Sequence, residues 1–257
     1  MKIDEILEAL AGADNFEVDK DNFIEFFRKN NCTAYSIDGS SVKILDAYSF
    51  SIFARRFGYN KANEKNIIER KIGEIELDVI YGENADAEND LMREKEEYKI
   101  AKEIAGNEIV IFDGCLKYKL EGIVGISKKS GYKKEKIPIL FAIKKVGEKI
   151  MKEKCWYYKI ENGIYAVKFN PYSKFIFRVD YFGKYPEEIF SEISALCKDI
   201  SCLGYPYCLA DIHRHVKISK DEENYLKHLI QKKAFEKGIS NEEWESIFYD
   251  YHEYIEG

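Results

Sequence analysis

Two apolar runs, each ending in an aspartate and a glycine, constrain the fold of this chain more than any other feature. Residues 34–37 lead into Asp38-Gly39-Ser40, and residues 109–112 lead into Asp113-Gly114-Cys115. Each pattern predicts a strand closed by a sharp turn, because glycine allows turn conformations, and open α/β sheets bind ligands at the carboxyl ends of their strands. Asp-Gly turns are also common without any function. If the two strands are neighbours, however, their carboxylates can share a hard divalent cation.

The composition indicates a cytoplasmic protein with one large core. The chain has 257 residues, of which 46% are hydrophobic, so one domain can bury a sizeable core. Its longest apolar run, residues 137–143, is far shorter than the roughly 20 residues that span a bilayer. Residues 1–8 carry acids where a signal peptide carries positive charge, and the six cysteines include no Cys-x-x-Cys pair. We therefore expect reduced thiols, a cytoplasmic location and no membrane partner.

The charge is unevenly distributed along the chain. The net charge is −6, which argues against a general binder of polyanions. Between Lys117 and Lys154, however, 12 Lys and 4 Glu give 12 − 4 = +8. Such a strip could bind a phosphate backbone, or it could be an ordinary solvated surface of helices and loops.

The spacing of apolar residues predicts a mixed sheet with flanking helices. Helices are expected over residues 3–11, 20–29, 88–105, 134–152, 186–200, 206–218, 221–236 and 241–254. Strands are expected over residues 32–37, 42–47, 49–56, 72–80, 108–112, 121–127, 155–160, 163–169 and 174–182. This order is that of a ribonuclease H-like α/β fold with a helical C-terminal region. In that layout the first and fourth strands are parallel neighbours, which brings Asp38 next to Asp113.

A third acid is needed for a strong cation site, and the helix over 88–105 supplies several candidates. These are Glu94, Glu96, Glu97 and Glu103. Glu97 shares a helical face with Ala101 and Ile104, which is the side expected to pack on the sheet. We therefore predict Glu97 as the third acid, with Glu96 on the flank as the alternative. With Mg²⁺ or Mn²⁺, such a cluster can activate water against a phosphodiester.

A tyrosine and a histidine eight residues apart form the next candidate group. Pro206 fixes the start of a helix that carries His213 two turns from Tyr205, so a phenol and an imidazole can face one site. Either residue alone is more often structural. Cys197, Cys202, Cys208 and His213 could also be combined into a zinc site, but their irregular spacing lacks the tight pairs of zinc knuckles.

Taken in order, these motifs resemble those of the NurA family of nucleases over residues 33–218. The likeness rests on Ser36-Ile37-Asp38-Gly39-Ser40, Glu97-Tyr98-Lys99-Ile100-Ala101, Ile111-Phe112-Asp113-Gly114-Cys115-Leu116, Gly122-Ile123-Val124-Gly125-Ile126-Ser127-Lys128, and Gly204-Tyr205-Pro206-Tyr207 followed by His213. This chain departs from the family pattern at Cys115, Cys208 and Ile212, and none of these departures removes a ligand that the resemblance implies. The resemblance predicts one domain over 1–257, with N-terminal helices in 1–30, a ribonuclease H-like core with an insertion in 31–218, and C-terminal helices in 219–257.

The resemblance also implies a function. It implies a homodimer with Mn²⁺- or Mg²⁺-dependent 5′-to-3′ exonuclease and single-strand endonuclease activity on DNA, acting with a hexameric HerA-type ATPase in DNA end resection and double-strand break repair. By motif, Asp38, Glu97, Asp113 and His213 would hold metal, and Tyr205 and His213 would support catalysis. Lys128 and Lys129 would contact DNA.

Two other classes of function compete with this one. An actin-like or sugar-kinase-like ATPase also begins with an acidic strand end, but it needs further glycine-rich turns around the nucleotide, and no convincing set is present. A non-catalytic scaffold subunit that docks a DNA translocase is the other alternative. Assays of DNA cleavage and of nucleotide binding would distinguish the nuclease, the ATPase and the scaffold.

Overall fold

The computed structural model describes residues 18–106, 108–120, 122–134 and 137–248, together with residues 3, 7, 8 and 11. The predicted helix over 3–11 and the end of the one over 241–254 therefore fall outside the continuously described residues. The chain divides into two compact units. The first comprises residues 1–37, 60–70 and 105–212, and the second comprises residues 38–59, 71–104 and 213–257.

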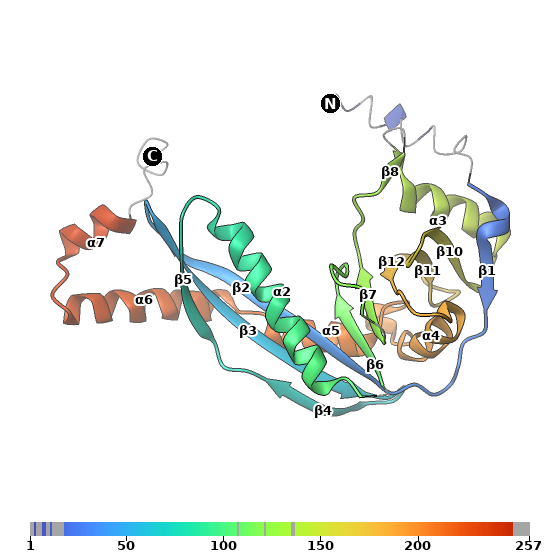
Figure 1. Ribbon diagram of the computed structural model, residues 1–257, viewed down its shortest axis with the longest axis horizontal. Helices are drawn as coiled ribbons and strands as arrows, with labels where there is room; N and C mark the ends of the chain where they lie inside the picture. Colours follow the sequence, from blue (N-terminus) through green and yellow to red (C-terminus); the bar gives the residue numbers. More distant parts are fainter. Residues whose placement is uncertain are drawn as a thin grey trace. The chain divides into compact units, whose positions relative to one another are not determined.

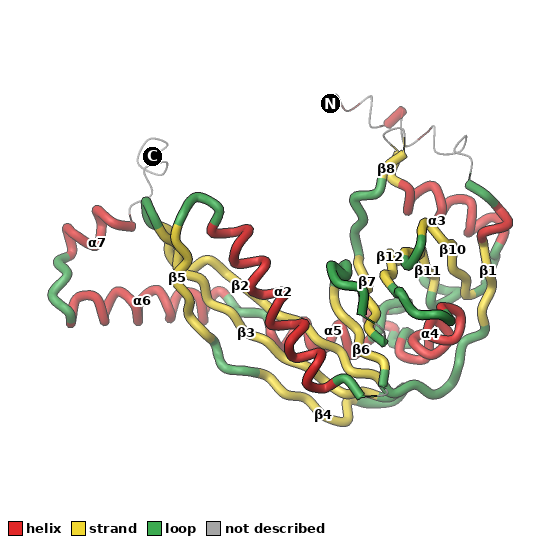
Figure 2. The backbone as a smooth tube through the Cα atoms, viewed as in Figure 1, coloured by secondary structure: helices red, strands yellow, loops and turns green. Residues whose placement is uncertain are grey.

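The strands of the first unit form a sheet in the order β1-β10-β11-β12-β7-β6-β2 (Figures 1 and 2). Their bounds are β1 (Phe23–Phe26), β2 (Ala34–Asp46), β6 (Ile109–Asp113), β7 (Ile123–Ser127), β10 (Cys155–Glu161), β11 (Ile164–Lys168) and β12 (Phe177–Asp180). β2, β6 and β7 are parallel, whereas the strands from β7 to β1 pair antiparallel. A separate two-stranded sheet joins β8 (Lys133–Lys134) to β9 (Ile137–Pro138). The predicted parallel pairing of the strands at 32–37 and 108–112 is confirmed.

Helices pack on the sheet of the first unit through large apolar side chains. They are α3 (Ile139–Ile150), α4 (Pro186–Ile193), the start of α5 (Tyr207–Val216) and the short 3-10 helix η3 (Ser194–Leu196). Two further 3-10 helices, η2 (Lys20–Asn22) and η4 (Ile200–Cys202), bury no residue. Ala142 and Ile143 of α3 share a buried cluster with Trp156. Phe190 of α4 contacts the rings of Phe26 and other aromatic residues of the sheet. Burial of this aromatic area stabilises the unit.

The second unit combines long strands with one helix from the middle of the chain and helices from its C-terminal part. Its elements are the rest of β2, most of β3 (Phe50–Ala62), the end of β4 (Ile67–Ile72), β5 (Glu76–Tyr81), α2 (Ala85–Ile104), α6 (Lys220–Glu236) and α7 (Asn241–Phe248). A capping box between Ser219 and Glu222 starts α6, and Glu222 also pairs with Arg56 of β3. Ile44 and Leu226 lie in one buried cluster, so α6 packs on these strands. In the described part of the chain, no helix is long and apolar enough to cross a membrane.

Several predicted elements differ from the structure, and tertiary contacts explain the two largest differences. The helix predicted over 134–152 begins only at Ile139, after β9. The predicted helix over 20–29 is a short 3-10 turn followed by β1. Phe23 and Phe26 are buried three residues apart, which imitates helical spacing, but they pair with Tyr158 and Cys155 of β10. The free energy gained by adding a strand to the sheet outweighs the weak helical preference of this segment.

The second error concerns the turn expected at Asp38-Gly39-Ser40. β2 continues unbroken from Ala34 to Asp46, so the predicted strands at 32–37 and 42–47 are one strand. A Cβ atom on Gly39 would lie 2.8 Å from Glu97 Oε1 and 2.8 Å from the Phe57 ring. Gly39 therefore allows close approach of neighbouring side chains, and it makes no turn. The predicted strand over 72–80 is likewise divided between the end of β4 and β5, whereas the helix over 88–105 and the strands near 109, 123, 155, 164 and 177 are confirmed.

Candidate metal centre

The two aspartates are brought together by the register of β2 and β6. The parallel pairing runs from Ala34 opposite Ile109 to Ile37 opposite Phe112. Asp38 and Asp113 are the next residues of the two strands. Asp38 is 5% exposed, and Asp113 is partly buried at the end of β6. The chain turns directly after Asp113, where Gly114 has a φ of +134° that favours glycine.

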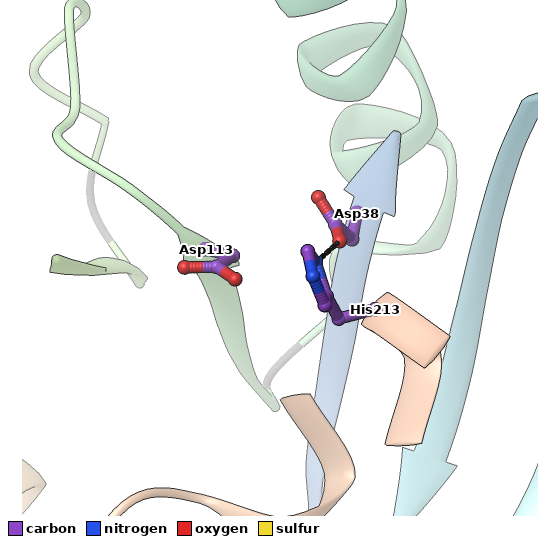
Figure 3. Close-up of side chains that lie close together, drawn as sticks. All are labelled: Asp38, Asp113 and His213. Carbon is purple, nitrogen blue, oxygen red and sulfur yellow. Dashed lines mark hydrogen bonds and ion pairs between the residues drawn. The ribbon is translucent and has the colours of Figure 1, made fainter. Parts of the chain in front are cut away.

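His213 of α5 completes a three-residue group. Its Nδ1 lies 2.7 Å from Asp38 Oδ2, the contact drawn as a dashed line in Figure 3. One ligand atom each from Asp38, Asp113 and His213 lies within 4.8 Å of the other two, and this is the one group of its kind among the described residues. Two carboxylates and an imidazole are a donor set that suits Mn²⁺ and, through its oxygens, Mg²⁺. The residues therefore fit a divalent cation.

Glu97 lies beside Asp38 but outside that group. Its side chain is 6% exposed, and Oε1 accepts a hydrogen bond from Arg93 Nη1 at 2.6 Å. Burial raises the pKa of Glu97 to about 8, and the negative charge of Asp38 adds to the rise, whereas Arg93 opposes it. A bound cation would favour the ionised form of this carboxyl group.

The placement of Glu97 on the packed face of its helix is confirmed. Glu96 has a side chain that is 39% exposed and pairs with Lys99 on the surface. The helical spacing therefore separated the two acids correctly, while the role of Glu97 as a ligand stays a prediction. Arg93 was missed, although its position four residues before Glu97 is the spacing of a helical ion pair.

Lys128 contacts Asp113 directly. It follows β7, and its Nζ lies 2.7 Å from Asp113 Oδ2 and 4.8 Å from the centre of the Tyr205 ring. The Tyr205 ring is buried and packs 5.3 Å from that of Phe177. Lys128 and Tyr205, predicted separately for DNA binding and for catalysis, are therefore neighbours at the carboxyl end of β6. The backbone carbonyl of Lys129 accepts a hydrogen bond from Ser127 Oγ at 2.7 Å.

A buried ion pair holds the turn that follows Asp113. Asp180 is 1% exposed and accepts a hydrogen bond of 2.9 Å from the backbone N–H of Leu116. Arg178 donates to both oxygens of Asp180, at 2.7 and 3.0 Å. Sequence reasoning missed the contact of Asp180 with the turn, since nothing in the local pattern links residues 116 and 180.

The zinc site made of cysteines has no support in the part of the chain that the structure describes. The metal-ligating group found there contains no cysteine. Burial raises the pKa of the Cys197 and Cys208 thiols, the latter to about 11.

The fold and the site define a class of protein. The mixed sheet with its flanking helices is a ribonuclease H-like architecture, as predicted. It carries two aspartates on strands and a histidine on a helix around a candidate cation site. A sequence model of the NurA domain matches residues 32–218, and the chain belongs to this family. Comparison with curated protein sequences gives no match.

Two solved structures of NurA proteins show the same architecture. The NurA nuclease from Sulfolobus solfataricus is 15% identical, with a TM-score of 0.71 over 91% of this chain and 94% of that one. A NurA structure bound to dAMP and manganese is 9% identical, with a TM-score of 0.61 over 86% and 92%. Endonuclease V from Ciona intestinalis, in complex with DNA, is 13% identical with a TM-score of 0.48, over 88% and 100%. At these identities the first two likenesses establish the fold.

Proposed function

We propose that this chain is a metal-dependent nuclease that hydrolyses phosphodiester bonds of DNA. The observation that carries the proposal is the convergence of Asp38, Asp113 and His213, with ligand atoms within 4.8 Å of one another. Membership of the NurA domain family supports it. The dAMP and manganese bound to a related NurA protein agree with the same chemistry.

Asp38, Asp113 and His213, with Glu97 close by, would hold Mn²⁺ or Mg²⁺. Such an ion supplies a Lewis acid and lowers the pKa of bound water. The chain's own residues have distinct tasks. Asp38 fixes the orientation of the His213 ring through the 2.7 Å contact at Nδ1. Lys128 places a positive charge beside Asp113, where a phosphate group would be attracted.

The finer features of the proposal follow the family resemblance. They are 5′-to-3′ exonuclease and single-strand endonuclease activity, a homodimer, and action with a HerA-type hexameric ATPase in DNA end resection and double-strand break repair. In this proposal Tyr205 and His213 support catalysis, and Lys128 and Lys129 contact DNA. Each of these features needs its own measurement.

The decisive experiment measures cleavage of end-labelled DNA with Mn²⁺, Mg²⁺ or EDTA. We expect metal-dependent cleavage that Asp38→Asn and Asp113→Asn each reduce by at least about a hundredfold, since losing one charged ligand of a shared cation costs several kcal/mol. Asp221→Asn, an exposed acid in the first turn of α6, is the matched control and should leave cleavage unchanged.

The same preparation tests the competing functions. Cleavage that survives both substitutions in folded protein overturns the proposed site. A purified protein that never cleaves DNA, yet binds a translocase, supports the scaffold alternative. Retention of ATP supports the ATPase alternative, because the proposed nuclease is not expected to bind a nucleoside triphosphate.

A further inference from the structure

The loop between β11 and β12 presents aromatic side chains to solvent. Tyr172 is 75% exposed and Phe175 is 65% exposed, with the exposed Lys174 between them. Ile200, on the neighbouring helix η4, is 91% exposed. Large apolar side chains that gather in solvent on one short loop are typical of a surface that binds a ligand or another macromolecule.

Buried polar anchors hold the backbone of this loop. Asn170, 2% exposed, donates from Nδ2 to the Cys197 carbonyl and accepts from the backbone N–H of Tyr172. Ser173, 4% exposed, donates to the Leu203 carbonyl at 2.9 Å and accepts from the Phe175 N–H. The loop is therefore fixed from inside while its rings face outward, so a ligand would bind them at a reduced entropic cost.

The same loop is fastened to the segment that carries Tyr205. Gly204 has a φ of +91°, and a Cβ atom there would lie 2.4 Å from Ser173 Oγ. The next residue is Tyr205, whose ring lies under the Lys128 ammonium, which in turn contacts Asp113. All of these residues belong to the first unit. The loop that carries the exposed rings is thus linked, through Ser173 and the segment of Tyr205, to Lys128 and Asp113.

We propose that Tyr172 and Phe175 form a stacking surface for the bases of single-stranded DNA, with Lys174 attracting the phosphate backbone. The inference deepens the proposed nuclease function and rests on it. Aromatic rings bind any base through its face, so such a surface is tolerant of sequence. In a duplex those faces are already stacked, so the surface favours single strands over double strands.

Binding without cleavage tests the proposal. We would measure the fluorescence anisotropy of a labelled oligothymidine and of a blunt duplex in EDTA. Tyr172→Ala and Phe175→Ala should each raise the Kd for the single strand about tenfold, which is the usual effect of removing one stacked ring, and leave the Kd for the duplex unchanged. Tyr172→Phe and Phe175→Tyr keep a ring and should bind as the wild type does. Tyr48→Ala, which removes a ring that is 85% exposed in the second unit, is the matched control.

Three results would overturn the inference. The first is an unchanged Kd for the single strand in the double alanine variant. The second is an equal loss of affinity for single strand and duplex, which would mean a general loss of fold or charge. The third is a change of oligomeric state in sedimentation by the double variant, which would assign the rings to a second copy of the chain. The nuclease proposal itself is tested by a different measurement, which is DNA cleavage by the Asp38 and Asp113 variants, so the two proposals can fail independently.

Discussion

Replacing Gly39 by alanine tests the most unexpected feature of the site, a strand that continues through an Asp-Gly pair. The added Cβ would lie 2.8 Å from Glu97 Oε1 and 2.8 and 2.9 Å from two carbons of the Phe57 ring, distances that real Cβ contacts do not show. Forced overpacking of this kind costs about 1–3 kcal/mol. Because both neighbours are held, Glu97 by Arg93 and Phe57 by its strand, we expect a loss of about 2 kcal/mol in the free energy of unfolding.

This loss of free energy of unfolding can be measured by urea unfolding, with circular dichroism as the signal. The control is Gly131→Ala, where no heavy atom lies within 4 Å of the new Cβ, and where alanine should be neutral or stabilise by up to about 1 kcal/mol. Adding Glu97→Ala to Gly39→Ala removes one of the clashes, so the double variant should lose less than the sum of the single losses. If Gly39→Ala is as stable as Gly131→Ala, the close approach of Glu97 to β2 is refuted.

The remaining predictions concern the site and its surroundings. In EDTA, Glu97→Gln should raise the thermal stability more at pH 8 than at pH 6. Between about pH 4.5 and the folded pKa of about 8, ionisation of this carboxyl group stabilises the unfolded state while the folded state keeps the proton, so the wild type loses stability over this range and the glutamine variant does not. An equal effect at both pH values would contradict this. Asp180→Asn breaks a buried ion pair and should cost about 3 kcal/mol in urea unfolding, whereas a loss under about 1 kcal/mol would show that the pair is dispensable. Lys128→Ala should weaken DNA binding and reduce the slope of log Kd against log salt by about 1 in anisotropy titrations, and an unchanged slope would remove it from the DNA contact. A thiol reagent should label the exposed Cys115 first, and buried thiols such as Cys197 only on unfolding, since burial raises their pKa; rapid labelling of more than the exposed and half-exposed thiols would contradict the described core.

The sequence predicted those parts of the fold that depend on regular periodicity. Residues 109–112 are uniformly apolar and form a strand buried on both faces, and Glu97 shares its helical face with Ala101 in both the prediction and the structure. The parallel pairing of β2 and β6 followed from the order of elements. This pairing predicts that Asp38 and Asp113 lie together.

What the sequence could not predict depends on contacts between distant residues. The strand through Gly39 is decided by Phe57 and Glu97, which lie far away in the chain, while the local Asp-Gly pair is typical of a turn. Likewise, the contact of Lys128 with Asp113 spans 15 residues and a strand, so composition could only suggest a basic strip. The roles of Glu97 and Tyr205 stay predictions.

The contact between Lys128 and Asp113 has a consequence for metal affinity. The ammonium group is a counter-ion that belongs to the chain itself, so a divalent cation that binds Asp113 has to compete with it. For an ion at the proposed site, the apparent dissociation constant would therefore include the free energy of moving this side chain to another partner. A phosphate oxygen would be such a partner, which couples ion loading thermodynamically to substrate occupancy.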